Sequence, residues 1–144
     1  MADATAGGRS IDDLREERAM EWQAECNCGQ LRATCAGEPD RVSVCHCTNC
    51  KRRTGSAFAW NASFPAKAVT TAGERQSFAR ATDSGRTNVY HFRPTCGSIV
   101  FYDVEMRSGM ISVPAGAFAS ADFPPPTVQV FDQRRVAWCT IEAE

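Results

Sequence analysis

Three cysteines fall within six residues of this chain, in the segment Cys45-His46-Cys47-Thr48-Asn49-Cys50. Thiols this close repel one another once they are ionised, unless a cation or a disulfide joins them. Zn²⁺ is the cation that best matches thiolate and imidazole ligands. Three protein ligands rather than four leave one coordination position open, as in catalytic zinc sites. We therefore predict a metal site on Cys45, Cys47 and Cys50, which we name the Cys45 triplet.

The segment continues directly into Lys51-Arg52-Arg53. A zinc ion held by three thiolates carries a net negative charge, so neighbouring cations offset that charge and lower the thiol pKa values. The same cations are suited to hold a substrate carboxylate. The plainer alternative is a solvated, charged turn.

A second close pair of cysteines lies in Cys26-Asn27-Cys28-Gly29. On an extended chain residues i and i+2 project to the same side, so both sulfurs can converge on one ion. Gly29 permits a tight turn directly after the pair. The pair alone is weak evidence, but it shares the chain with the Cys45 triplet and with Cys96-Gly97-Ser98.

The overall composition is that of one soluble globular domain. The chain has 144 residues, with 43% apolar and 23% charged residues. Its net charge of -1 argues against nucleic acid and anionic membranes as partners. No apolar run is long enough to span a membrane and no secretory signal is visible, so we expect a cytoplasmic protein. Eight cysteines in a reducing compartment indicate metal or thiol chemistry.

We predict two regions along the chain. Residues 1–21 form an N-terminal extension that is partly disordered. Within it, Ser10 and Asp13 fit a capping box that would begin a short helix over residues 10–20, although a charged floppy tail fits as well. Residues 22–144 form a single domain that is mainly β, because short runs of β-branched and aromatic residues alternate with turns.

The expected strands are short, and the turns between them contain glycine, proline or serine. Their ranges are Leu31–Ala36, Val42–Cys45, Ala57–Phe64, Ala68–Thr71, Arg75–Ala79, Thr87–Phe92, Ser98–Val104, Met110–Val113, Thr127–Phe131 and Val136–Ile141.

The order of the cysteine motifs resembles the glutathione-dependent formaldehyde-activating enzyme family, which includes centromere protein V-like members. The motifs that carry the resemblance are Cys26-x-Cys28-Gly29, then Cys45-His46-Cys47-x-x-Cys50-Lys51-Arg52-x-x-Gly55-Ser56, then Cys96-Gly97-Ser98. The resemblance spans about residues 22–140. It implies a β-tent zinc fold of short antiparallel strands, two zinc sites and carbon–sulfur lyase chemistry.

The resemblance also implies roles for individual cysteines. The Cys45 triplet corresponds to the ligands of a labile, catalytic zinc. Cys26, Cys28 and Cys96, which we name the Cys26 triplet, correspond to three of the four ligands of a structural zinc. The family usually reads Phe-Cys-x-x-Cys-Gly-Ser, whereas this chain has Arg93 where the first cysteine would stand. A guanidinium stays protonated and has no lone pair for zinc.

Four outcomes stay open for the Cys26 triplet. Zinc binds three thiolates and water, with Arg93 as a nearby cation; His91 rotates in as the fourth ligand; Cys35 or Cys139 takes that place; or the site is empty and packing alone holds the fold. On their own, we interpret His91 as an ordinary strand residue and the two cysteines as small buried hydrophobes. His46 lies between ligands and points away from them if the segment is extended. We interpret it as a neighbouring or surface residue rather than a ligand.

The leading functional hypothesis is a zinc-dependent carbon–sulfur lyase that uses the Cys45 triplet. Its substrates would be a small thiol such as glutathione and a small aldehyde such as formaldehyde, with Lys51, Arg52 and Arg53 binding the carboxylates of the thiol. The alternative from a different class is a non-catalytic zinc module that binds a protein or a nucleic acid. A third, weaker hypothesis is redox sensing by a disulfide among the three thiols. We allow for a homodimer.

Overall fold

The structure of the chain, a computed structural model, describes Ile11, residues 20–82 and residues 84–143. The predicted helix over residues 10–20 lies almost wholly outside these residues, and the division at residue 21 stays a prediction. Within the described residues the fold is mainly β, as expected, with one α-helix and several turns of 3₁₀-helix. None of the described helices is long and apolar enough to cross a membrane.

The strands form two sheets. A three-stranded sheet has the order β1-β2-β5, and a seven-stranded sheet has the order β10-β3-β4-β9-β8-β7-β6. The strand bounds are β1 Glu21–Glu25, β2 Arg32–Ala36, β3 Arg41–Cys45, β4 Ala59–Pro65, β5 Val69–Ala72, β6 Gln76–Ala81, β7 Thr87–Phe92, β8 Ile99–Val104, β9 Met110–Pro114 and β10 Val128–Val130. The pairings between these strands are antiparallel except β10 with β3, which is parallel.

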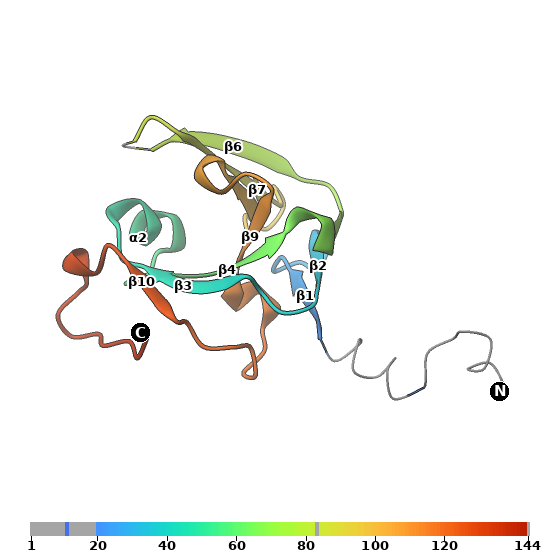
Figure 1. Cartoon of the computed structure of the whole chain (residues 1–144). Helices are drawn as coiled ribbons and strands as arrows, with labels where there is room; N and C mark the ends of the chain where they lie inside the picture. Colours follow the sequence, from blue (N-terminus) through green and yellow to red (C-terminus); the bar gives the residue numbers. More distant parts are fainter. Residues whose placement is uncertain (1–10, 12–19, 83, 144) are drawn as a thin grey trace.

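The seven-stranded sheet is strongly curved. In Figure 1 the β10–β3–β4 part lies below, the β6–β7 hairpin lies above, and β9 lies between them. Helix α2 lies at one end of this arrangement and the three-stranded sheet lies toward the other (Figure 1). The 3₁₀ turns are η2 Ala66–Ala68, η3 Glu105–Arg107, η4 Ala115–Phe118 and η5 Asp132–Arg134.

The hydrophobic core joins the two sheets. Phe118 from η4 stacks on Phe123 with 4.6 Å between ring centroids, and Trp22 from β1 meets Phe123 edge-on at 4.8 Å. Phe64 in β4 is fully buried and packs on Phe118. Aromatic pairs of this kind add to the free energy gained by burying apolar surface. The core therefore holds β1 against β4, the strand that follows α2. Because β1 leads directly into Cys26, the core also positions that cysteine.

Most predicted strands are present with small shifts at their ends, and Thr87–Phe92 has the predicted bounds. The predicted strand Val136–Ile141 is wrong. The Cys139 N–H donates to the Val136 carbonyl at 3.3 Å, which closes a turn, and the Trp138 side chain is 80% exposed. The apolar residues of this segment therefore do not form the buried face of a strand.

One short helix was not predicted. Helix α2 covers Thr48–Thr54, with Cys47 as its N-cap, and it ends at Gly55 in the left-handed conformation. The signals were present in the sequence, because glycine often ends a helix and basic residues favour its last turn. The helix carries Lys51, Arg52 and Arg53, so it decides where each of these charges points.

Gly73 provides a test of how tightly the β5–β6 turn packs against the turn that contains Cys26. It has φ +112, and a Cβ there would lie 2.1 Å from the Gln30 carbonyl oxygen. We expect Gly73→Ala to lower the free energy of unfolding by at least about 2 kcal/mol, from backbone strain plus this clash. Denaturant unfolding of the purified chain measures the loss.

The matched control is Gly109→Ala. Gly109 has φ +86 but open space around the added Cβ, so this variant carries the backbone strain without the clash. We expect it to lose about 1 kcal/mol. Equal losses for the two variants would contradict the close packing of the turn at Gly73.

Candidate metal centre

The Cys45 triplet is assembled where β3 ends and α2 begins. Cys45 is the last residue of β3, Cys47 caps α2, and Cys50 lies in its first turn. The three sulfur atoms lie within 4.8 Å of one another. The Cys50 N–H donates to the Cys47 sulfur at 3.3 Å, as a side chain at an N-cap does for the first turn of a helix. The predicted ligands are therefore brought together by local backbone structure.

Arg53 lies against this triplet from within the fold. Its Nη2 is 3.8 Å from the Cys50 sulfur, and its guanidinium lies over the rings of Tyr90 and Tyr102 at 5.1 and 4.9 Å. Cations over aromatic faces are stabilised by the ring quadrupole. Asn49 and Asn88 donate to the Tyr90 hydroxyl at 3.3 and 3.4 Å, which fixes that ring. A half-buried positive charge is thus held next to Cys50.

The charge of the triplet is concentrated on one sulfur in this arrangement. A hydrogen bond from the Cys45 thiol, with the Arg53 charge beside it, lowers the pKa of Cys50 to about 5. The same hydrogen bond, together with burial, raises the pKa of Cys45. Burial also raises the pKa of the Tyr102 hydroxyl, so it stays neutral next to Arg53. Ionisation is therefore favoured at Cys50 over Cys45, and both sulfurs suit Zn²⁺ once Cys45 also loses its proton.

His46 separates two of these cysteines but is not grouped with them. Its side chain is 1% exposed, so the interpretation of His46 as a surface residue is wrong. Its Nε2 lies 2.8 Å from the Gln129 side-chain oxygen, and its backbone N–H donates to the Val130 carbonyl at 3.0 Å. The parallel pairing of β10 with β3 buries the ring. His46 thus anchors the loop of the triplet to the C-terminal strand.

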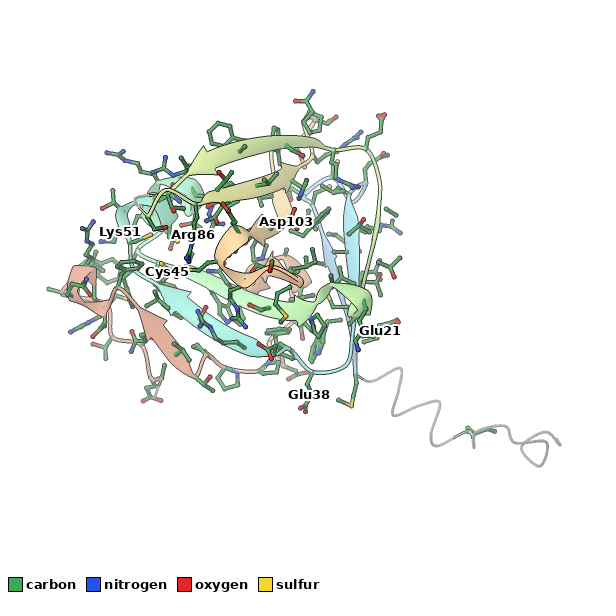
Figure 2. All side chains as sticks on the ribbon, turned by 45° about the horizontal axis from the view of Figure 1, so that its top comes forward. Glu21, Glu38, Cys45, Lys51, Arg86 and Asp103 are labelled. Atoms are coloured by element: carbon green, nitrogen blue, oxygen red, sulfur yellow. The ribbon has the colours of Figure 1, made fainter. Side chains whose placement is uncertain are left out.

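Lys51 and Arg52, the other two basic residues of α2, do not face the Cys45 triplet as Arg53 does. Lys51 donates from Nζ to the Arg134 carbonyl at 2.6 Å, and Arg52 is exposed. Arg134 in turn donates to the Thr48 hydroxyl at 3.2 Å. In Figure 2 Lys51 and Arg86 both lie on the side of the molecule where Cys45 is labelled. Lys51 is half-buried and Arg52 is exposed, so neither cation faces the thiols as Arg53 does.

The Cys26 triplet joins two turns. Cys26 and Cys28 follow β1, and Cys96 lies in the turn between β7 and β8; their sulfurs also lie within 4.8 Å of one another. The Asn27 N–H donates to the Ser98 hydroxyl at 3.1 Å, which links the two turns directly. The Leu31 N–H donates to the Cys26 sulfur at 3.2 Å. The three thiols predicted to share a site are therefore held together by hydrogen bonds of the protein itself.

Hydrogen bonds also favour the ionised form of two of these thiols. The backbone and the hydroxyl of Ser98 lower the pKa of Cys96 to about 6. Burial acts against ionisation of Cys26, but hydrogen bonds from the Leu31 backbone and the Cys28 side chain leave its pKa below the ordinary value. Thiolates are the form in which cysteine binds metal ions. The donor chemistry of both triplets therefore fits zinc.

The residues considered for a fourth ligand are engaged elsewhere. His91 contacts the Ser77 hydroxyl through Nδ1 and the Asp103 carboxylate through Nε2, both at 2.8 Å. Cys35 is fully buried in β2, and burial raises its pKa to about 12. Neither residue, nor Cys139, is grouped with a triplet in the described part of the chain.

Comparison with known proteins supports the fold and the family. A solved structure of a Rhodobacter sphaeroides protein from a structural genomics programme is similar, with a TM-score of 0.54 and 15% identity over 75% of this chain and 99% of that chain. Curated proteins give no match. The profile of the family described as glutathione-dependent formaldehyde-activating enzyme matches residues 21–134, which include both triplets. The chain therefore belongs to the glutathione-dependent formaldehyde-activating enzyme family.

Proposed function

We propose that the chain is a zinc-dependent carbon–sulfur lyase that forms and cleaves the adduct of a small thiol, of the glutathione type, with a small aldehyde. The observation that carries the proposal is the convergence of the Cys45, Cys47 and Cys50 sulfurs within 4.8 Å, without a fourth His, Cys, Asp or Glu donor from the described residues. Three ligands leave one coordination position for a substrate. A bound zinc ion would supply the acidity that makes a coordinating thiol a thiolate near neutral pH.

The reaction class is a reversible addition. In the forward direction the thiol sulfur bonds to the carbonyl carbon and the thiol proton ends on the aldehyde oxygen; cleavage reverses both changes. The protein groups around the triplet support this chemistry by their charge. Arg53 offsets the negative charge that accumulates on the three sulfurs, because its guanidinium lies 3.8 Å from the Cys50 sulfur in a half-buried position.

The sequence-based hypothesis gave Lys51, Arg52 and Arg53 one shared role in binding carboxylates. We now divide that role. Arg52 is exposed, and the Lys51 ammonium has donors left beyond its bond to the Arg134 carbonyl. These two cations are suited to carboxylates of a thiol that approaches from solvent. The Arg53 guanidinium faces Cys50 and two tyrosine rings, so we assign it to the thiolates.

An interaction module remains the second candidate, because two large apolar side chains lie exposed close to the basic residues. Trp138 is 80% exposed and Phe131 is 49% exposed, and Arg134 and Arg135 lie between them in the chain. Such residues are typical of binding surfaces. Tightly retained zinc without any thiol-dependent turnover would favour this candidate over the lyase.

The first test compares Cys47→Ser with Cys139→Ser. Cys47 belongs to the triplet, whereas Cys139 lies outside both groups of thiols. We expect Cys47→Ser to lose one zinc per chain and to lose catalysis of adduct formation from glutathione and formaldehyde, followed by exchange NMR above the uncatalysed background. Cys139→Ser should keep both. Unchanged zinc content in Cys47→Ser would overturn the metal site.

The second test separates Arg53 from Arg52. Replacing Arg53 by Met removes a half-buried cation next to the thiolates, and we expect zinc affinity at the Cys45 triplet to fall about 10- to 100-fold, the usual effect of losing a group that supports metal ligands. Chelator competition measures the affinity. Arg53→Lys should lose less, because it keeps the charge.

Arg52→Met is the matched surface change. It should leave zinc affinity unchanged and raise KM for glutathione relative to a thiol without carboxylates. A loss of zinc affinity in Arg52→Met as large as in Arg53→Met would contradict the division of roles between the two arginines.

A further inference from the structure

We propose that the Cys26 triplet is a second metal site whose fourth coordination position is open and takes a small thiol or water from solution. The inference concerns thiols outside the Cys45 triplet and does not depend on the proposed lyase activity. Three observations support it: the donor missing at residue 93, the lack of a further His, Cys, Asp or Glu grouped with these thiols among the described residues, and the exposure of Cys28.

Residue 93 stands where a fourth ligand would close the site. The Arg93 N–H donates to the Ser98 carbonyl at 3.0 Å and the Gly97 N–H to the Arg93 carbonyl at 2.6 Å, so Arg93 and Cys96 lie in one tight turn. Their spacing is that of the C-x-x-C pairs that bind zinc from such turns. An arginine at this position supplies no lone pair.

The Arg93 side chain has a different partner. Its Nη1 donates to the Glu74 carbonyl at 3.3 Å and lies 3.8 Å from the Glu74 carboxylate. This contact ties the β7–β8 turn to the β5–β6 turn, which packs on Gln30 through Gly73. The Asn27–Ser98 hydrogen bond joins the β7–β8 turn to the turn of Cys26 and Cys28. Together with the Arg93–Glu74 contact, it holds the turn of Cys96 in place without a fourth ligand.

Other protein ligands are not poised to complete the site. Both ring nitrogens of His91 are hydrogen-bonded, and the ring stacks on Phe101 with 4.6 Å between centroids. Cys35 is fully buried in β2. Among the described residues, no further His, Cys, Asp or Glu belongs to the group formed by the three cysteines. The described residues thus leave the fourth position of a tetrahedral ion open, and we assign it to a ligand from solution.

The thiols are accessible to such a ligand. Cys28 is exposed and Cys96 is half-buried. A cavity of about 630 Å³ lies on the side of Cys26, with Cys26, Asn27 and Ser98 in its wall. This volume is ample for a small thiol. A thiol that bound a metal held by Cys26, Cys28 and Cys96 would do so as the thiolate, and its proton would go to the solvent.

The experiment uses the full chain loaded with Co²⁺, whose absorption reports the number of thiolate ligands, and titrates it with 2-mercaptoethanol. The Cys47→Ser background isolates the Cys26 triplet. We expect one Co²⁺ per chain in this background and a change in its spectrum as the added thiol binds. Arg93→Cys in the same background should show a four-thiolate spectrum that does not respond to thiol.

Arg93→Ala is the control, because it removes the guanidinium without adding a donor. Its cobalt spectrum should change with added thiol as it does in the Cys47→Ser chain that keeps Arg93. Should the Cys47→Ser background not fold, the same comparison is made without it: two Co²⁺ ions per chain are expected, and Arg93→Cys should halve the thiol-induced change.

Two results would overturn the proposal. If Co²⁺ occupies the Cys26 triplet only in Arg93→Cys, the natural site is empty. If the spectrum shows four thiolates before any thiol is added, another cysteine completes the site. Both results are distinct from failure of the lyase proposal, which would appear as absent turnover by the wild-type chain while the cobalt spectra stay as described.

Discussion

The crowding of three ionisable thiols within 4.8 Å is the constraint on which the rest of this structure depends, because thiolates at that distance repel one another. Each triplet stays assembled because the backbone fixes its cysteines at the ends of strands and in tight turns, and because nearby groups offset the negative charge. At the Cys45 triplet the offset is a full positive charge, since Arg53 is held over Tyr90 and Tyr102. At the Cys26 triplet it is a set of hydrogen bonds from Leu31 and Ser98. One fold thus contains two different solutions to the same electrostatic problem.

These solutions give the triplets different chemical characters. At the Cys45 triplet a half-buried guanidinium lies 3.8 Å from the Cys50 sulfur and offsets negative charge there directly. The Cys26 triplet has weaker dipolar support, but it joins two turns that hydrogen bonds already hold, through Asn27 and Ser98. Its geometry therefore does not depend on a metal ion with four protein ligands, which explains how the fold accommodates Arg93.

The sequence predicted which cysteines converge, and it predicted the mainly β fold, because the decisive information is local. Cysteines two or three residues apart converge through backbone geometry alone, and alternating residues such as those of Thr87–Phe92 mark a strand with one buried face. What depends on distant partners was missed. The burial of His46 requires β10 to pair with β3 across more than eighty residues, and nothing near His46 encodes that pairing. The predicted strand Val136–Ile141 failed for the converse reason, since its apolar residues have no neighbouring strand to pair with.

The missed helix had the largest functional consequence. Read as an extended turn, Lys51-Arg52-Arg53 is one basic patch with one role. On helix α2, Arg53 lies three positions after Cys50 and therefore on the same face. Arg52 lies two positions after Cys50 and points in a different direction. Helical geometry therefore sends Arg53 inward to the thiolates and leaves Arg52 in solvent. The different roles that we propose for Arg53 and Arg52 therefore follow from a rotation of about 100° per residue along one short helix.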